Sequence, residues 1–185
     1  MGSDTYGVAF VCTGNRFRSP LAAAAFESKA DVPVEVVSAG LLGLGPVPAL
    51  PEAVELAKSY GLDLTSHRSR DLSGIDLEPF DLVLGFERSH VQAAVVDASA
   101  HMESTFTLPE LVLLLEGISE RDTNADPVAR ARERVADAHA ARLPTFRTSG
   151  MPEIVDPLGR SRREQRAIAE EVSRLTERLA ALLFG

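Results

Sequence analysis

Short apolar runs that alternate with helix-forming stretches constrain the fold of this chain more than any other feature. Four runs rich in Val, Phe, Leu and Thr are short enough for strands, at residues 6–12, 34–39, 81–86 and 104–108. The first three are almost continuously apolar, which predicts strands buried on both faces. Helix-forming stretches at 20–30 and 51–60 each open with a proline that suits a first helical turn.

Strands that alternate with helices imply an α/β fold, a parallel sheet with helices on both faces. The clearest helix is the last one, where the apolar residues are spaced by four, three, four and three positions: Ile168, Val172, Leu175, Leu179 and Leu182. This spacing predicts a face that packs against the core. A length of 185 residues suits one domain, which we expect to span 1–185.

The stretch from about 115 to 150 departs from this alternation, and we interpret it as an insertion. Asp126 and Pro127 predict the cap and first turn of a surface helix. The following "LPTFRTSGMP", at 143–152, is rich in turn formers and predicts a loop.

Charge and cysteine content exclude several functional classes. The formal net charge is -8, which argues against a surface for nucleic acid or an anionic membrane, because such surfaces need a clustered basic excess. The chain has one cysteine, and no basic segment followed by a long apolar stretch opens it. These features favour a cytoplasmic protein. The four histidines show no metal-ligand spacing, so no metal or cofactor is expected.

The single cysteine lies where chemistry is expected. In "VCTGNRFRSP", at 11–20, a predicted buried strand ends at Cys12, and Ser19 with Pro20 predicts the cap and first position of a helix. Unpaired N–H groups and the dipole at a helix N-terminus favour an anion, and Gly14 would let the loop turn its N–H groups inward. The same setting stabilises a thiolate, so Cys12 is a candidate nucleophile.

Arg18 completes a candidate anion site. Its planar guanidinium can hold two oxygens of a tetrahedral oxyanion, which lysine cannot do with the same geometry. A lone cysteine or arginine is more often a core or surface residue, but a thiolate and an anion cradle together indicate attack on phosphorus.

The string "VCTGNRFRSP" resembles the signature of the low-molecular-weight protein tyrosine phosphatases, a cysteine, five residues, an arginine, then serine and proline. The resemblance continues outside the 115–150 segment, in "SAG" at 38–40, "GLDLTSHRSRDL" at 61–72, "DLVLGFERSHV" at 81–91 and "VDPLG" at 155–159. It implies a four-stranded parallel sheet with helices on both faces, of the phosphotyrosine protein phosphatase I type.

The resemblance also implies a mechanism in two steps. Cys12 would attack phosphorus to form a phosphocysteine, while Arg18 and the loop N–H groups hold the equatorial oxygens. An aspartate in an Asp-Pro pair would protonate the leaving oxygen and then act as base on water. Two pairs compete, and we favour Asp156 over Asp126, because Asp126 is explained as a helix cap whereas Asp156 leads into the last helix.

Further site residues follow from the same resemblance. The phosphate-binding loop would consist of Thr13, Gly14, Asn15, Arg16, Phe17 and Ser19. Ser38 and His67 would support it from outside, with Asn15 fixing the loop and the Ser19 hydroxyl donating to the thiolate. We interpret His90 as part of the cap of the helix after the third strand and assign it no chemistry.

Two departures from the family pattern concern the substrate. Phe17 stands where members commonly carry a second cysteine, and Leu158 and Gly159 stand where members carry aromatic residues. Leu41, Leu42 and Leu44 would supply an aliphatic wall or belong to the core. The expected substrate is a phosphorylated protein, with phosphotyrosine favoured, or a small phosphate ester, and the product is inorganic phosphate. The alternatives are an arsenate reductase that uses an external small thiol and a phosphate-binding regulatory module without turnover.

Overall fold

The computed structural model describes residues 5–119, 126–149 and 152–185. Its centre is a parallel sheet of four strands in the order β2-β1-β3-β4. The strands are β1 (Tyr6–Cys12), β2 (Val34–Gly40), β3 (Leu82–Gly85) and β4 (Thr105–Thr107). The predicted α/β class and the four-stranded parallel sheet are therefore confirmed.

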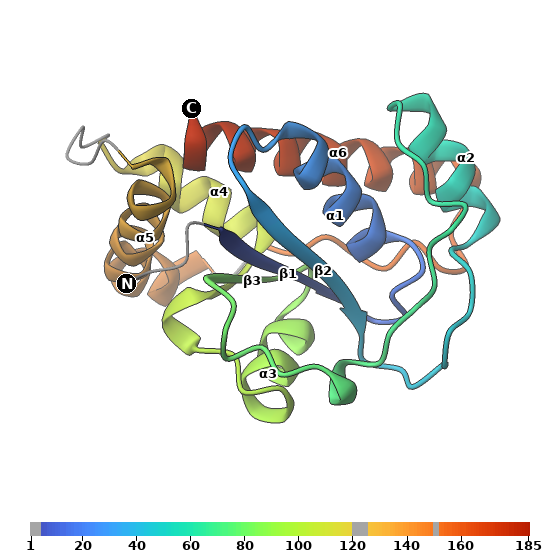
Figure 1. Ribbon diagram of the computed structural model, residues 1–185, viewed down its shortest axis with the longest axis horizontal. Coiled ribbons are helices and arrows are strands. Elements are labelled where there is room, and N and C mark those ends of the chain that lie inside the picture. The colour runs from blue at the N-terminus through green and yellow to red at the C-terminus, as the bar shows by residue number, and fades with distance from the viewer. Residues whose placement is uncertain (1–4, 120–125, 150–151) are drawn as a thin grey trace.

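Helices cover both faces of this sheet (Figure 1). They are α1 (Arg18–Lys29), α2 (Pro51–Ser59), α3 (Arg88–Asp97), α4 (Leu108–Gly117), α5 (Pro127–Ser149) and α6 (Arg162–Phe184), with short 3₁₀ turns at Leu72–Gly74 and Met102–Ser104. The cluster against one face includes residues of α1, α4, α5 and α6, whereas α3 packs on the other face.

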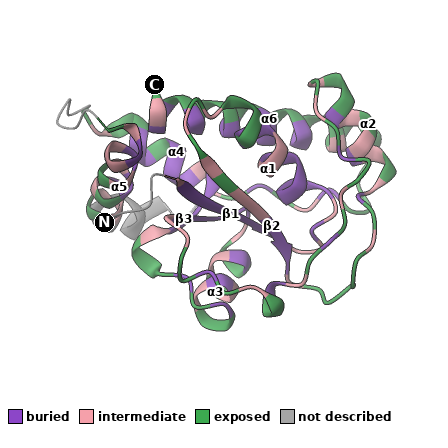
Figure 2. Cartoon of the chain, in the orientation of Figure 1, coloured by how far each residue is buried: buried purple, intermediate pink, exposed green. Residues whose placement is uncertain are grey.

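The side chains of β1 show how the two cores are separated. Tyr6, Val8 and Phe10 belong to the cluster with α1 and α6, and the intervening Ala9 and Val11 belong to the cluster with α3. This division follows from the strand period of two, and every residue of β1 is buried (Figure 2).

The prediction of full burial is wrong for the start of β2. Residues 34–37 are only half-buried or exposed, and burial begins at Ser38. The reason is the strand order, since β2 lies at an edge of the sheet and pairs only with β1. The predicted packing face of α6 is confirmed, because all five residues of its apolar stripe are buried.

The stretch at 115–150 forms a longer helix than predicted. The predicted cap is confirmed, since Asp126 Oδ1 accepts from the N–H of Val128 at 3.1 Å. The predicted loop at 143–152 is wrong as far as Ser149, because α5 continues to that residue. The residue types at 143–149 favour turns only as a local preference, and the preceding turns of α5 override this preference. Residues 120–125 and 150–151, which fall in these predicted segments, lie outside the described residues.

The helix α5 packs into the main core, and ion pairs also hold it in place. Its apolar side chains in the cluster are Val128, Ala131, Val135 and Ala138. Arg132 Nε lies 2.7 Å from Asp81 Oδ1, and Arg142 Nε lies 2.7 Å from the fully buried Glu110 Oε1. The contacts therefore tie α5 to the segments before β3 and after β4.

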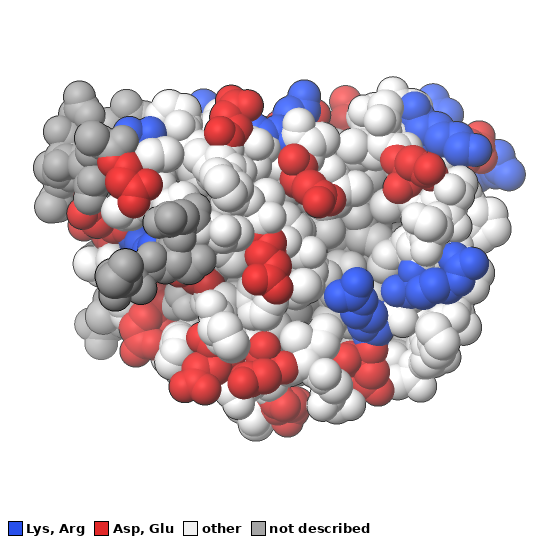
Figure 3. Space-filling model, in the orientation of Figure 1, with Lys and Arg blue, Asp and Glu red and all other residues white. Residues whose placement is uncertain are grey.

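Charge is distributed unevenly over the visible face. Acidic side chains are spread across much of it, whereas basic side chains gather toward the end of the molecule that carries α2 (Figure 3). No helix within the described ranges is long and apolar enough to cross a membrane.

Candidate active site

The loop that follows β1 places the single cysteine at the carboxyl end of a central strand. The predicted cap at Ser19 is wrong, because α1 begins at Arg18 after Phe17, without a side-chain cap. The Ser19 hydroxyl instead lies 3.0 Å from Cys12 Sγ, and the N–H of Asn15 donates to the same sulfur at 3.2 Å. Both partners can stabilise negative charge on the sulfur.

The loop turns at a different residue from the one predicted. The positive φ falls at Asn15, at 51°, and not at Gly14. Asparagine tolerates this conformation better than most residues with a side chain. Gly40, the last residue of β2, allows this loop to approach closely, since a Cβ at that position would lie 2.8 Å from Asn15 N.

The Asn15 side chain fixes the loop through three hydrogen bonds. Its Nδ2 donates to Ser19 Oγ at 2.9 Å and to Ser38 Oγ at 2.8 Å, and its Oδ1 accepts from the N–H of Arg70 at 2.8 Å. Because Ser19 Oγ accepts from Asn15, its own hydrogen is left for Cys12 Sγ or for Ala39 O, which is more distant at 3.3 Å. The contact to sulfur is therefore the favoured one when the thiolate forms.

His67 supports the same loop from outside. Its Nε2 donates to the Asn15 carbonyl oxygen at 2.7 Å, which fixes the hydrogen on Nε2. Burial lowers the pKa of His67 below its ordinary value, although the bond to the Asn15 carbonyl partly opposes this shift. The structure thus brings His67, Ser38 and Ser19 around Asn15, as the resemblance implied.

Arg18 is almost fully buried, at 1% exposure, and its contacts orient the guanidinium. Nη1 donates to Ile154 O at 2.8 Å and lies 3.4 Å from Glu87 Oε2. Nη2 donates to Thr13 Oγ1 at 2.9 Å and to Asp156 Oδ2. No described residue accepts from Nε, so this donor is available to a bound anion.

Asp156 lies at the same site, whereas Asp126 is a helix cap. Besides its contact with Arg18, Asp156 accepts from the N–H of Leu158 at 2.8 Å through Oδ1. Its side chain remains 37% exposed, so solvent and a substrate can reach it. The segment before it is fixed to the end of β3, because Ile154 N donates to Phe86 O at 2.8 Å. The geometry therefore supports the choice of Asp156 between the two Asp-Pro pairs.

Two residues of the site were missed by sequence reasoning. Glu87 contacts Arg18, and its Oε2 also lies 3.4 Å from His90 Nε2. His90 forms part of the cap of α3, as predicted, but its Nε2 lies 3.1 Å from Thr13 Oγ1. Their position soon after the third strand could have indicated that they belong to the site, because the carboxyl ends of neighbouring parallel strands lie at the same edge of the sheet.

A pocket opens above the cysteine. Its lining combines the predicted loop with aliphatic residues of two other segments: Cys12, Thr13, Gly14, Arg16, Phe17, Arg18, Leu42, Leu44, Leu50, Asp156, Pro157 and Leu158. Leu42 and Leu44 supply the expected aliphatic wall, but Leu41 does not line this pocket and packs against the cluster around α3. Arg16 is fixed in the wall because its Nε donates to Pro48 O at 2.9 Å.

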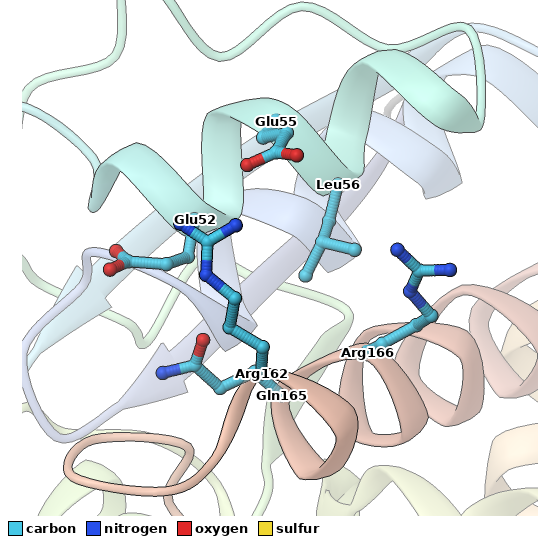
Figure 4. Close-up of a pocket in the computed structure, with 6 residues that line it drawn as sticks. All are labelled: Glu52, Glu55, Leu56, Arg162, Gln165 and Arg166. Carbon is cyan, nitrogen blue, oxygen red and sulfur yellow. The ribbon is translucent and has the colours of Figure 1, made fainter.

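A second cavity lies between α2 and α6 and is of a different kind (Figure 4). It is lined by Glu52, Glu55, Leu56, Arg162, Gln165 and Arg166. This lining contains no cysteine that could act as a thiolate nucleophile. It combines the carboxylates of two glutamates with two arginines. The pocket above Cys12 is therefore the candidate active site.

Comparisons with known proteins agree with this geometry. The family model described as low molecular weight phosphotyrosine protein phosphatase matches residues 7–112. A probable low molecular weight protein-tyrosine-phosphatase, EpsP, from Ralstonia nicotianae is 36% identical over 101 residues, which is 55% of this chain and 69% of the relative. A protein-arginine-phosphatase from Bacillus subtilis is 37% identical over 108 residues, 57% of this chain and 71% of the relative.

Solved structures extend the similarity over nearly the whole chain. A low molecular weight protein tyrosine phosphatase from T. tengcongensis has a TM-score of 0.67 at 30% identity, covering 94% of this chain and 97% of that one. The YwlE arginine phosphatase from Geobacillus stearothermophilus has a TM-score of 0.65 at 28% identity, covering 95% and 91%. With a cysteine, an arginine and an aspartate at one pocket of the shared fold, this chain belongs to the low molecular weight phosphotyrosine protein phosphatase family and is a phosphatase.

Proposed function

We propose that this phosphatase hydrolyses phosphotyrosine in proteins, with Cys12 as nucleophile, Arg18 as the transition-state clamp and Asp156 as acid and base. One observation carries the proposal. Cys12, Arg18 and Asp156 line a single pocket, and Arg18 contacts the Asp156 carboxylate. A nucleophile, an oxyanion clamp and a proton donor are the three groups that such a transfer needs.

In the first step the Cys12 thiolate attacks phosphorus, and the bond from phosphorus to the tyrosine oxygen breaks. The leaving oxygen takes its proton from Asp156, while Arg18 and the loop N–H groups hold the equatorial oxygens. In the second step water attacks the phosphocysteine and gives a proton to Asp156. The sulfur leaves as a thiolate, which the Ser19 hydroxyl and the Asn15 N–H can stabilise, and inorganic phosphate is released.

The pocket walls favour tyrosine over arginine as the phosphorylated residue. Phe17, Leu42, Leu44, Leu50, Pro157 and Leu158 offer an apolar surface to an aromatic ring. A phosphorylated guanidinium has N–H donors that need acceptors, and among the described lining residues Asp156 is the one carboxylate. Arg16 adds a positive charge to the wall, which would repel a guanidinium.

The size of this preference can be bounded. A buried donor without an acceptor costs about 1–3 kcal/mol, which corresponds to about 5- to 150-fold in kcat/KM. The test uses two peptides with the same flanking sequence, one with phosphotyrosine and one with phosphoarginine. We expect kcat/KM to be about 5- to 150-fold higher for the phosphotyrosine peptide than for the phosphoarginine peptide. Arg16→Gln should reduce this ratio of kcat/KM values.

Cys12→Ser serves as the control for mechanism. It should abolish turnover of both peptides and still bind inorganic phosphate, because serine has a far higher pKa than a thiol but leaves the cradle in place. Equal or better turnover of the phosphoarginine peptide would refute the substrate assignment. Turnover by Cys12→Ser would refute the mechanism itself.

A further inference from the structure

Thr13 lines the active-site pocket, and its side chain belongs to a hydrogen-bond network that reaches α3. We propose that the Thr13 hydroxyl donates a hydrogen bond to the phosphoryl group held above Cys12, and that His90 orients this hydroxyl. The inference rests on the proposed function, because it assigns a further donor to the same site. Thr13 would then act through its side chain and not only through the backbone of the loop.

The position of the hydrogen on His90 follows from its contacts. Nδ1 accepts from the N–H of Phe86 at 3.2 Å and from the N–H of Glu87 at 3.0 Å. A backbone N–H can only donate, so Nδ1 carries no hydrogen and the neutral ring is protonated at Nε2. Burial lowers the pKa of His90 to about 3, with Arg18 acting in the same direction and Asp156 opposing it. The imidazole is therefore neutral at physiological pH.

The fixed tautomer makes His90 a donor toward Thr13. Its Nε2 lies 3.1 Å from Thr13 Oγ1, closer than the 3.4 Å to Glu87 Oε2. The Thr13 oxygen also accepts from Arg18 Nη2 at 2.9 Å. A hydroxyl has two lone pairs and one hydrogen. Both lone pairs are used, so the hydrogen must point in the remaining direction.

No described residue accepts this hydrogen, since His90 and Arg18 are the polar partners of the Thr13 side chain and both donate to it. Thr13 lines the same pocket as Cys12 and Gly14. An anion beside the sulfur is the acceptor that the pocket chemistry supplies. A donor whose orientation is fixed before the substrate arrives needs no reorganisation during reaction, which is the condition for efficient oxyanion stabilisation.

Helix capping alone does not explain the choice of histidine at position 90. The cap of α3 uses the acceptor Nδ1, and an asparagine oxygen would satisfy the same need. The Nε2–H takes no part in the bonds to these backbone amides, and its nearer partner is Thr13 Oγ1 at 3.1 Å, with Glu87 Oε2 at 3.4 Å. His90 is therefore a positioning residue, and its two nitrogens have separable roles.

Because the two nitrogens of His90 have separable roles, four variants can test the proposal. Thr13→Val removes the hydroxyl with little change in shape, and Thr13→Ser restores it. His90→Asn keeps an acceptor for the cap and removes the donor to Thr13, and the fourth variant combines His90→Asn with Thr13→Val. We would measure kcat and KM on a phosphotyrosine peptide, inhibition by orthovanadate, and thermal unfolding to confirm that each variant folds.

We expect Thr13→Val to lower kcat by about 100-fold, the usual size for one oxyanion donor, and to weaken orthovanadate inhibition, with little change in KM. Thr13→Ser should restore most of the activity. His90→Asn should lower kcat less, by about 10-fold, because the hydroxyl remains but is no longer oriented. In the Thr13→Val background, His90→Asn should have no further effect on kcat.

Two results would overturn the proposal. The first is a Thr13→Val protein whose kcat and orthovanadate inhibition stay within about twofold of the wild type. The second is an effect of His90→Asn that is equally large with and without the Thr13 hydroxyl, which would indicate a structural role of the ring. Neither result touches the role of Cys12, which Cys12→Ser tests separately.

Discussion

Replacing His90 with asparagine should remove a pH dependence of stability that the fold imposes. Burial lowers the pKa of His90 from 6.5 to about 3, and the positive charge of Arg18 acts in the same direction. Asp156 opposes the shift, and Glu87 lies 3.4 Å from Nε2. The contacts agree with this direction, since a proton on Nδ1 would face the N–H groups of two backbone amides.

The magnitude follows from the two pKa values. In the unfolded chain His90 binds a proton below about pH 6.5, whereas in the folded protein it stays neutral down to about pH 3. The contribution to stability is therefore complete above pH 6.5 and is lost as the pH falls, by about 1.4 kcal/mol per unit. Between pH 7 and pH 5 the free energy of unfolding should fall by about 2 kcal/mol on account of this one ring.

Urea unfolding at pH 7, 6 and 5 measures the effect. The wild type should lose about 2 kcal/mol more than His90→Asn over this range, and His101→Asn, a change at an exposed histidine, should behave like the wild type. The pKa of His67 is also lowered, but its contribution is common to all three proteins and cancels in the differences. A difference between wild type and His90→Asn that does not change with pH would refute the reasoning.

Two further predictions concern the catalytic groups. Arg18→Lys should lower kcat by orders of magnitude although the charge is kept, whereas Arg16→Lys should have a mild effect; equal losses in steady-state assays would count against Arg18 as the clamp. Asp156→Asn should slow a phosphate ester with a poor leaving group by about a hundred- to ten-thousand-fold and an ester of a very acidic phenol much less. Asp126→Asn should change neither rate, because asparagine caps a helix about as well, and a leaving-group effect at Asp126 would reverse the assignment.

The parts of the fold that depend on local sequence could be predicted. The apolar spacing in α6 and the short strands each follow from a periodicity within the segment itself. The partial exposure of β2 could not be predicted, because it depends on which strands pair with it. The helix at 143–149 was missed for a similar reason, since residue types there favour turns while the chain continues an established helix.

The candidate site also has one part that could be predicted from local sequence and one part that could not. The loop around Cys12 and Arg18 is one continuous string, so its chemistry could be inferred from residue types and spacing alone. Glu87 and His90 lie far from the loop along the chain, with 77 positions separating His90 from Thr13, and reach the loop only because β3 pairs with β1. From the sequence, helix capping was a sufficient explanation for His90. Its second role is indicated only by the structure, in which Nε2 lies 3.1 Å from Thr13 Oγ1.

The contacts of Arg18 also bear on how its substitution should be interpreted. Its guanidinium contacts Ile154 O and the Asp156 carboxylate, so it fixes the segment that carries the acid as well as the oxyanion site. Further anchors of this segment are the bonds from Ile154 N to Phe86 O, from Arg88 N to Glu153 Oε1 and from Thr107 Oγ1 to Pro152 O. Lysine has one ammonium group and cannot replace both contacts while it also serves the phosphoryl oxygens. The loss in Arg18→Lys therefore combines weaker charge stabilisation with a displaced acid, and this coupling makes the effects of Arg18 and Asp156 non-additive.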